Sequence, residues 1–448
     1  MSATTIDPTR AGPARPSRGR LALTYGLPAL LAVALLFRVI VVLSTPHFVP
    51  HTDAADYDRI AVSLAQHGRF PSSLLAPTGG PTAYRTPLFP LALAAVYKIV
   101  GVGSATTRWE AGRMLEAVLG MIAVALIYAI AARIWDRRAG LVAAGIAAVY
   151  PPLVLVGSSL MSESLFIPLV LAAVLAALRH RSSAHRWRWA VAAGVLVGLA
   201  ALTRSNGVVL VIPVAFLAWS GRPRWTWDSL RSPLTVGLAL VATLVPWTIR
   251  NEQVFHSFVP ISTEGGYALA GTYSQYAAAE RKYPAMWAPP VFQQQALLAR
   301  HPRDDEAQLS SGLLTDGLRY MEHHPSYVAK ALYWNALRLL GVTGAGYERY
   351  LAPYESYPKW LATDSVYAFW VLGLLALAGC FVAAAREAPW ALWGCPVAVF
   401  CSTVVFLGAT RYRAPADPFL IMLAALALIA AWDRRRGSRG RRVASAAA

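Results

Sequence analysis

Long apolar runs recur along the whole chain and restrict its fold more than any other feature. An apolar stretch of about 18 or more residues can cross a bilayer as a helix. Only 14% of the 448 residues are charged, whereas soluble domains carry about 25%. We therefore predict an all-α polytopic membrane protein with about ten transmembrane helices. The predicted spans are 21–44, 108–132, 139–157, 162–178, 188–203, 206–220, 233–249, 362–384, 389–408 and 415–432.

The distribution of arginine between the spans predicts how the chain is oriented. The net charge is +18, and the arginines cluster in short segments between apolar runs. Lys and Arg are enriched in cytoplasmic loops, so we expect a membrane partner rather than a nucleic acid. With both termini in the cytoplasm, the inward segments all carry arginine, and the outward connection 157–163 has neither Lys nor Arg. These inward segments are 133–138, 179–188, 221–231, 385–388 and 433–442.

The span list divides the chain into five segments. Residues 1–20 are rich in Pro, Arg, Ser and Gly and are expected to be a disordered cytoplasmic tail. An N-terminal transmembrane catalytic module and a C-terminal group of helices flank a large polar and aromatic outer loop. The segments after the tail are 21–249, with a first outer loop at 45–107, then 250–361, 362–432 and a basic cytoplasmic tail at 433–448.

Two apolar pieces in the outer segments are predicted to lie on the membrane surface. Residues 85–101 are short and carry Pro87 and Pro90 near their start, and crossing the membrane would reverse every later loop. Residues 327–342 contain one lysine and one arginine. Both pieces are expected to be outer-face interfacial helices, with spanning as the alternative.

The stretch HTDAADYDRIAVSLAQHGRF (51–70) places three aspartates directly after the first span. Apolar residues recur at helical spacing over 54–67, and a glycine follows, which predicts an amphipathic helix on the outer leaflet. Asp53 or the threonine before it is expected to cap this helix. Asp56 lies near the first turn, where a carboxylate suits the helix dipole.

Arginines also occur at the outer ends of the predicted spans, although Lys and Arg are enriched on the cytoplasmic side. A cation at membrane depth is costly and usually faces a cavity or a partner, and the guanidinium fork suits phosphate oxygens. Any one of them could instead snorkel to water. Together with acids at the same depth, they predict a site for an anionic lipid headgroup. They are Arg204, Arg250, Arg411 and Arg413, with Arg85 on the same side.

Seven short motifs follow one another along most of the chain. They are D-A-A-D-Y (53–57), A-x-x-L-x-x-x-G-x-F (61–70), Y-R-T-P-L-F-P (84–90), S-E-S-L-F (162–166), L-T-R-S-N-G (202–207), P-W-T-I-R-N (246–251) and R-Y-R-A-P (411–415). In this order they resemble the polytopic glycosyltransferases of superfamily C, the type of the bacterial aminoarabinose transferases and protein O-mannosyltransferases. The motifs are loose singly and specific together, and they leave the sugar and the acceptor open.

The resemblance implies a sugar donor carried on a polyprenyl phosphate and used on the outer face of the membrane. The family's catalytic Asp lies in the first outer loop, where Asp53 matches it, and Tyr57 matches a tyrosine that follows. Many members carry Glu directly after that Asp, but this chain has Ala54. A role for a second acid, metal binding included, would then fall to Glu163 or Asp56. For Glu163, a first-turn helix acid is the equal alternative.

The predicted reaction moves the sugar to a hydroxyl of a glycan, lipid or protein acceptor, with inversion at the anomeric carbon. Asp53 is the expected base, and the arginines stabilise the departing phosphate without a metal. No particular cofactor is predicted, and a divalent cation stays open. Further pocket residues are Tyr57, Tyr84, Asn206, Asn251 and Tyr412.

Two other functions compete with this prediction. A transporter or flippase for a lipid-linked sugar would also want arginines at depth, but it favours paired halves and charges near the midplane. An O-antigen ligase would place its catalytic residues in one large late loop, for which 250–361 is the candidate. The Ala- and Arg-rich composition indicates a bacterium, so we expect the protein in the inner membrane.

Overall fold

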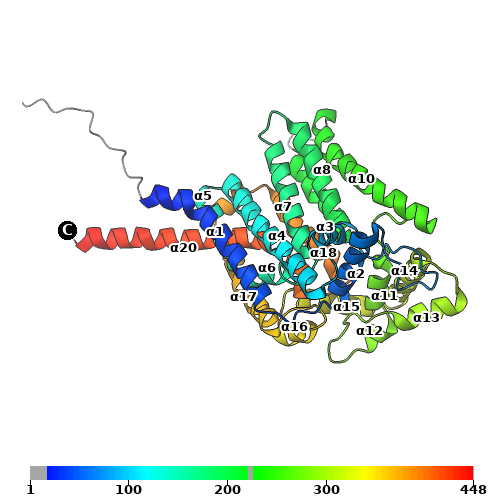
Figure 1. The fold of residues 1–448 in the computed structure, drawn as a ribbon. Coiled ribbons are helices and arrows are strands. Elements are labelled where there is room, and N and C mark those ends of the chain that lie inside the picture. The colour runs from blue at the N-terminus through cyan, green and yellow to red at the C-terminus, as the bar shows by residue number, and fades with distance from the viewer. Residues whose placement is uncertain (1–17, 220–225, 447–448) are drawn as a thin grey trace, which may run out of the picture.

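The computed structural model describes residues 18–219 and 226–446. In this part of the chain the regular elements are helices, and the only strand-like pairing is one isolated bridge between Ser72 and Pro81. The all-α fold of a polytopic membrane protein is therefore confirmed. In Figure 1 the long helices form one bundle, and the helices of the outer segments gather beside one end of it.

Five described helices are long and apolar enough to cross a membrane on their own. They are α1 (Arg18–Leu43), α4 (Ala105–Ile134), α7 (Glu163–His180), α10 (Trp227–Phe255) and α17 (Lys359–Cys380). The other predicted spans coincide with shorter, broken or less apolar helices, so the count of ten stays a prediction. These are α5 (Arg137–Val149) with α6 (Pro151–Val156), α8 (Arg186–Thr203), η1 (Ser205–Leu210) with α9 (Val211–Ala218), α18 (Trp390–Val404) and α20 (Asp417–Ala446).

The predicted span 139–157 is broken between α5 and α6. Pro151 starts α6, and because proline has no N–H, it cannot continue the hydrogen-bond ladder of α5. The buried Arg38 of α1 donates to the carbonyl oxygens of Ala148 and Leu153, on either side of the break. Hydrogen bonds from this cation satisfy carbonyl oxygens next to the break, which stabilises a helix end inside a bundle.

The outer segments are folded rather than loop-like. The predicted helix in 54–67 is α2 (Thr52–His67), and the two pieces predicted to be interfacial are the helices α3 (Leu88–Val100) and α15 (Pro325–Leu339). The region 250–361, predicted as a long loop, contains most of the remaining short helices. They are α11 (Glu264–Thr272), α12 (Gln275–Ala279), α13 (Val291–Arg300), α14 (Glu306–His323) and α16 (Ala345–Leu351), while η2 (Ala383–Glu387) and α19 (Thr410–Arg413) lie beyond.

The structure contradicts one capping prediction and extends helices into the two predicted tails. The N-cap of α2 is His51, with no side-chain cap bond, so the capping role predicted for Thr52 or Asp53 is wrong. Of the predicted disordered tail, residues 1–17 lie outside the described residues, and 18–20 already belong to α1. The basic tail at 433–448 continues α20 as helix as far as Ala446. Gly68 ends α2 with a φ of 66°, as predicted.

The buried Glu306 of α14 joins the first outer loop to the 250–361 region. Its carboxylate accepts hydrogen bonds from the hydroxyls of Ser73, Thr82 and Thr263 at 2.5, 2.7 and 2.7 Å. It also accepts the backbone N–H of Ala83 at 2.9 Å. A buried carboxylate is tolerated only when its oxygens are satisfied. The three bonds from Ser73, Thr82 and Ala83 hold the two outer segments together, and the bond from Thr263 fixes Glu306 within its own segment.

Candidate functional site

Asp53, in the first turn of α2, lies between two arginines from distant parts of the chain. Its Oδ1 accepts a hydrogen bond from Nη2 of Arg85 at 2.6 Å, and its Oδ2 accepts one from Nη2 of Arg411, also at 2.6 Å. Burial alone would raise the pKa of Asp53, but the charges of the two arginines hold that pKa well below its usual range. The carboxylate is therefore ionised in the substrate-free protein.

Arg85 brings three carboxylates together just before α3. Besides Asp53, its guanidinium donates to Oδ2 of Asp56 at 3.0 Å and to Oε1 of Glu264 at 2.7 Å. The side chain of Arg85 is 8% exposed, and its guanidinium also lies 4.6 Å from the ring centre of Tyr84. Because an arginine presents several N–H donors in a fixed plane, one residue can orient α2 and the start of α11.

Arg411 and Glu163 form a second, deeper group of charges. Nε of Arg411 lies 3.2 Å from Oε1 of Glu163, and Nη1 of Arg204 lies 2.7 Å from the same oxygen. Arg411 also donates to the sulfur of Met161 and to the hydroxyl of Tyr412. Glu163 therefore lies between two cations and is also the acid in the first turn of α7, so its position fits both alternatives that the sequence leaves open.

The structure brings most of the predicted site residues together. Tyr57 donates its hydroxyl to Oγ of Ser162 at 3.1 Å, next to Glu163, and the guanidinium of Arg204 lies 5.4 Å from the ring centre of Tyr412. The residues that converge are Asp53, Asp56, Glu163, Arg85, Arg204, Arg411, Tyr57, Tyr84 and Tyr412.

Two of the predicted phosphate ligands lie elsewhere. Arg413 pairs with Asp417 at 3.0 Å and lies over the ring of Phe369. Because residues two apart on a helical turn point in nearly opposite directions, Arg413 cannot share the site of Arg411. The guanidinium of Arg250 packs against aromatic rings 4.8–5.0 Å away.

The two predicted asparagines also lie away from the charges at Asp53. Arg250 donates to Oδ1 of Asn251, and Asn251 donates to the carbonyl oxygen of Val259. Asn206 donates to Oγ of Ser402 at 3.5 Å. None of these residues, nor Arg413, lines the cavity beside Asp53.

A cavity of about 740 Å³ opens beside Asp53, a size typical of ligand sites. Its charged lining residues are Asp53, Asp56, Arg59, Glu264, Glu355, Arg85 and Arg411. Its wall also carries apolar and aromatic side chains, among them Trp287 and several tyrosines. The charges that the sequence predicts thus face a space large enough for a substrate.

Two of the cavity carboxylates, Glu264 and Glu355, were not predicted. Glu264 pairs with Arg85, and Glu355 lies 3.7 Å from Nε of Arg411 and accepts the hydroxyl of Tyr357. Burial raises the pKa of both carboxyls above the usual value. Each lies within ten residues of the end of a long helix, and this position in the sequence could have indicated both residues.

The site does not fit the divalent cation that the sequence leaves open. Among the described residues, no group of three or more His, Cys, Asp or Glu side chains is placed to hold a metal ion. The carboxylates of Asp53, Asp56 and Glu264 converge instead on the guanidinium of Arg85. That cation already occupies the position between them, so no chemical step is derived through a metal.

Glu116 of α4 supports the site from behind. Its fully buried carboxylate accepts the backbone N–H groups of Leu160 and Met161 at 2.8 and 2.6 Å. Leu160 has a φ of 55°, which is strained for a branched side chain. Glu116 therefore holds an irregular turn whose next residues are Ser162 and Glu163.

Comparisons with known proteins found a similar family sequence and similar folds. The sequence model of the family Dolichyl-phosphate-mannose-protein mannosyltransferase matches residues 84–249, the part that contains Arg85, Glu163 and Arg204. The fold is similar to that of the archaeal oligosaccharyltransferase AglB from Archaeoglobus fulgidus, solved with an inhibitory peptide and a dolichol-phosphate; the TM-score is 0.57 at 15% identity. The chain resembles the superfamily C glycosyltransferases. The resemblance that the motifs indicate is thereby confirmed.

The matching structures belong to longer proteins. The AglB match covers 94% of this chain and 52% of that one. A second structure of the A. fulgidus oligosaccharyltransferase, tethered with an acceptor peptide containing the NVT sequon, gives a TM-score of 0.56 at 16% identity over 93% and 50%. This chain thus spans about half the length of that enzyme. ArnT from Cupriavidus metallidurans, bound to undecaprenyl phosphate, gives a TM-score of 0.41 at 17% identity over 92% and 77%. No curated protein sequence matches the chain.

Proposed function

We propose that this protein is a membrane glycosyltransferase that moves a sugar from a polyprenyl-phosphate donor to an acceptor hydroxyl. The observation that carries the proposal is the carboxylate of Asp53, held by Arg85 and Arg411 at the wall of a substrate-sized cavity. The fold shared with an oligosaccharyltransferase that was solved with a dolichol-phosphate supports the donor class.

The arginines of the site supply the charge that a lipid phosphate requires. Arg85 and Arg411 line the cavity, and Arg204 lies behind them on Glu163. Each of the three is ion-paired with a carboxylate in the substrate-free protein. A donor phosphate would compete for these guanidinium groups, whose planar donors match phosphate oxygens.

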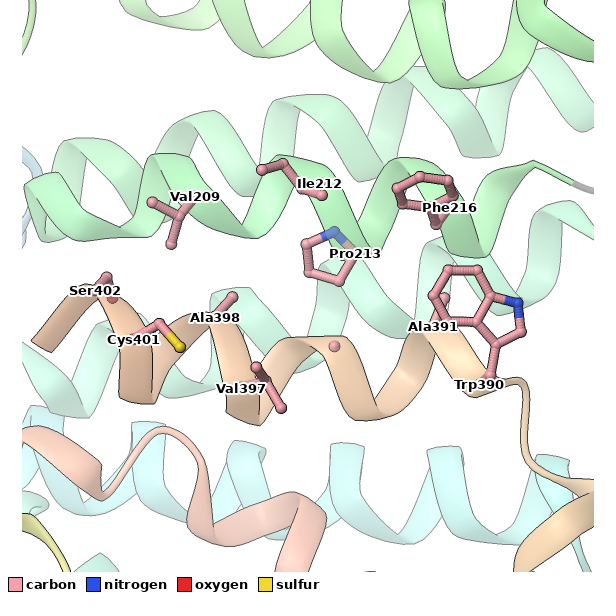
Figure 2. A pocket seen from close by; sticks show the side chains of 11 residues that line it. Val209, Ile212, Pro213, Phe216, Trp390, Ala391, Val397, Ala398, Cys401 and Ser402 are labelled. Carbon is pink, nitrogen blue, oxygen red and sulfur yellow. The ribbon is translucent and has the colours of Figure 1, made fainter. Parts of the chain in front are cut away.

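An apolar groove near these arginines is suited to the lipid tail. Figure 2 shows side chains of η1 and α9 facing side chains of α18 across a space of about 500 Å³. Asn206, which follows Arg204 by two residues, is hydrogen-bonded to Ser402 at the outer end of this space. The rings of Phe216 and Trp390 meet at its inner end. A polyprenyl chain attached to a phosphate near Arg204 could follow this groove into the bilayer.

Filling the groove is expected to weaken use of long-chain donors selectively. Val397 lines the groove and is 59% exposed, so Val397→Trp should fit without disturbing the core. We expect KM to rise about tenfold for a donor with a full polyprenyl chain and to stay unchanged for a short-chain analogue. Transfer kinetics with donors of graded chain length measure the effect.

The matched control for this variant is Val371→Trp on α17. Val371 is 58% exposed and does not line the groove. An equal rise in KM for short and long donors, or the same effect in the control, would place the lipid tail elsewhere.

The proposed chemistry is a single displacement. The acceptor oxygen attacks the anomeric carbon as the bond from that carbon to the phosphate oxygen breaks. The hydroxyl proton passes to the carboxylate of Asp53, and the lipid phosphate leaves with the bonding electron pair. Attack from the face opposite the phosphate inverts the anomeric centre. Arg85 and Arg411 are placed to stabilise the negative charge that develops on the leaving phosphate.

The pairing of Asp53 implies an order of events. With both oxygens held by arginines, its carboxylate has a depressed pKa and is a weak base. A donor phosphate that draws Arg85 or Arg411 toward itself removes part of this stabilisation and raises the pKa. We therefore infer that the donor binds before the acceptor proton is taken.

The orientation of the chain supports action on the outer face of a bacterial inner membrane. The site lies at the end of the bundle where α1 finishes at Leu43 and α7 begins at Glu163. The arginine-rich connections lie at the opposite end. Exposed tryptophans such as Trp187 and Trp390 begin helices on that opposite side, where aromatic residues mark a membrane interface.

The proposed function is tested by sugar transfer from a panel of polyprenyl-phosphate sugars to a mixture of glycan, lipid and peptide acceptors. Purified protein in lipid nanodiscs is compared with Arg204→Ala, with and without EDTA. We expect transfer by the wild type and weaker donor binding by the variant. Movement of an intact lipid-linked sugar across vesicles, with no sugar transferred, would identify a transporter instead.

Removing the support of the Glu163 turn is expected to slow transfer. Without the Glu116 carboxylate, the turn at Leu160 loses two buried acceptors, and Glu163 is no longer held against Arg204 and Arg411. Since small displacements at a site can cost about 100-fold in rate, we expect a fall of that order in kcat for Glu116→Ala.

The design for this prediction includes one conservative variant and one control. Glu116→Gln keeps one acceptor oxygen and should recover part of the rate. Glu110→Gln changes an exposed carboxylate on the same helix and should leave kcat unchanged. If Glu116→Ala lowers the melting temperature but not kcat, its role is confined to folding.

A further inference from the structure

We propose that the acceptor is a saccharide, bound against the aromatic side chains of the cavity; this inference rests on the proposed function. The charged side chains of the cavity are the groups that would act on the donor. The aromatic side chains have no part in that chemistry, yet they line the same space. They therefore form an acceptor subsite.

Three of the aromatic lining residues are tyrosines from one segment. Tyr347, Tyr350 and Tyr354 all line the cavity, and their spacing places them on one side of α16 and the turn that follows. The ring centres of Tyr350 and Tyr354 are 5.7 Å apart, and these rings are 36% and 52% exposed. A row of accessible rings offers successive flat faces to a chain of sugar units.

Trp287 lines the same cavity and packs closely against Gly271. Its Nε1 donates to the carbonyl oxygen of Tyr267 at 3.4 Å. A Cβ added to Gly271 would lie 2.0 Å from that nitrogen, so only glycine leaves room for the indole. A fixed, half-buried indole loses little conformational entropy on binding.

Carboxylates stand beside the rings, and this combination favours a saccharide. Glu264 uses Oε1 for Arg85 while its side chain stays 36% exposed at the cavity, and Asp56 and Arg59 line the wall next to it. Aromatic faces bind the C–H faces of sugar rings, and carboxylates and guanidinium groups bind their hydroxyls. An aromatic belt for lipid would not need charges within an enclosed wall.

The experiment measures acceptor choice and its dependence on the rings. Linear tri- and tetrasaccharides of hexoses and of pentoses, serine- and threonine-containing peptides, and a phospholipid acceptor are each offered with a polyprenyl-phosphate sugar panel. We expect transfer to a saccharide, with KM for that acceptor raised roughly tenfold or more by Trp287→Ala and by Tyr350→Ala. Tyr350→Phe, which keeps the ring, should restore most of the affinity.

The controls separate this inference from the proposed function. Tyr333→Ala removes a ring that is 59% exposed on α15 and outside the cavity, and it should not alter KM. Binding of undecaprenyl phosphate reports on the donor site of each variant and should persist. Transfer to peptide or lipid alone, unaffected by Trp287→Ala and Tyr350→Ala, overturns the saccharide while the transferase stands. Absence of both donor cleavage and donor binding in the wild type overturns both.

Discussion

Asp53→Asn is expected to lower the rate of sugar transfer by about 10²–10⁴-fold while the donor still binds. Asparagine keeps the size of the side chain and one acceptor oxygen, but it cannot take the acceptor proton. Single-turnover transfer measures the chemical step, and equilibrium binding of undecaprenyl phosphate measures the donor site. The two measurements together separate a lost base from a disrupted arginine pair.

The control for this variant is Asp58→Asn on the same helix. Asp58 also forms an ion pair, with Arg108 at 2.9 Å, and accepts the hydroxyl of Tyr97, but it does not line the cavity. Its replacement should leave the transfer rate of the folded protein unchanged. Retention of wild-type transfer by Asp53→Asn would contradict the assignment of Asp53 as the base.

The pH dependence of transfer follows from the same ion pairs. In the donor-free protein Arg85 and Arg411 hold the pKa of Asp53 below its usual range, so protonation of free protein requires strongly acidic conditions. Once the donor phosphate engages these arginines, the pKa rises. We therefore expect the acid limb of kcat to lie at higher pH than the acid limb of kcat/KM for the donor. Coincident limbs would show that the donor does not share the arginines with Asp53.

Arg411→Ala is expected to have the largest effect on donor binding. The side chain of Arg411 is 2% exposed and bridges Asp53 and Glu163. Its removal takes away a phosphate ligand and leaves Glu163 with one cation less in a buried setting. Losing one partner of a buried charge pair costs about 2–5 kcal/mol, which corresponds to a rise in donor Kd of roughly 30-fold to several thousandfold.

Two further variants test the role of Arg411 against that of its neighbour. Arg411→Lys restores a charge but cannot reach both carboxylates at once, so intermediate binding is expected. Arg413→Lys alters the pair with Asp417, away from the cavity, and should lower thermal stability without changing donor Kd. Equal effects of Arg411→Ala and Arg413→Lys on donor Kd would contradict the geometry.

Sequence patterns predict the charged centre of this site because its parts are local features at the ends of apolar runs. Asp53, Arg204 and Arg411 can each be found in this way. The direction of a side chain at a helix end is not local, which is why Arg413 and Arg250 turn away into aromatic packing. Glu264 escapes prediction because it comes from a segment with no strong periodicity. Its role appears only when that segment folds over the first outer loop.

The helical breaks inside the bundle are predictable only in part. Two prolines after Tyr150 indicate an interruption, but nothing in the pattern shows that Arg38 crosses from another helix to satisfy the freed carbonyls. Glu116 is similar, because a carboxylate within an apolar run gives no sign of which backbone groups it binds. Such contacts depend on tertiary packing between segments far apart in sequence.

The ion pairs of Arg85, Arg204 and Arg411 with carboxylates also affect the selectivity of the protein among anions. A free phosphate or sulfate ion must displace resident carboxylates that are already in place, and it has only its own charge with which to do so. A phosphate on a polyprenyl chain adds the burial of its tail, about 0.8 kcal/mol for each methylene. Small anions in the medium should therefore not inhibit the protein. Only an anion that carries a hydrocarbon tail gains enough binding free energy to displace the carboxylates from these arginines.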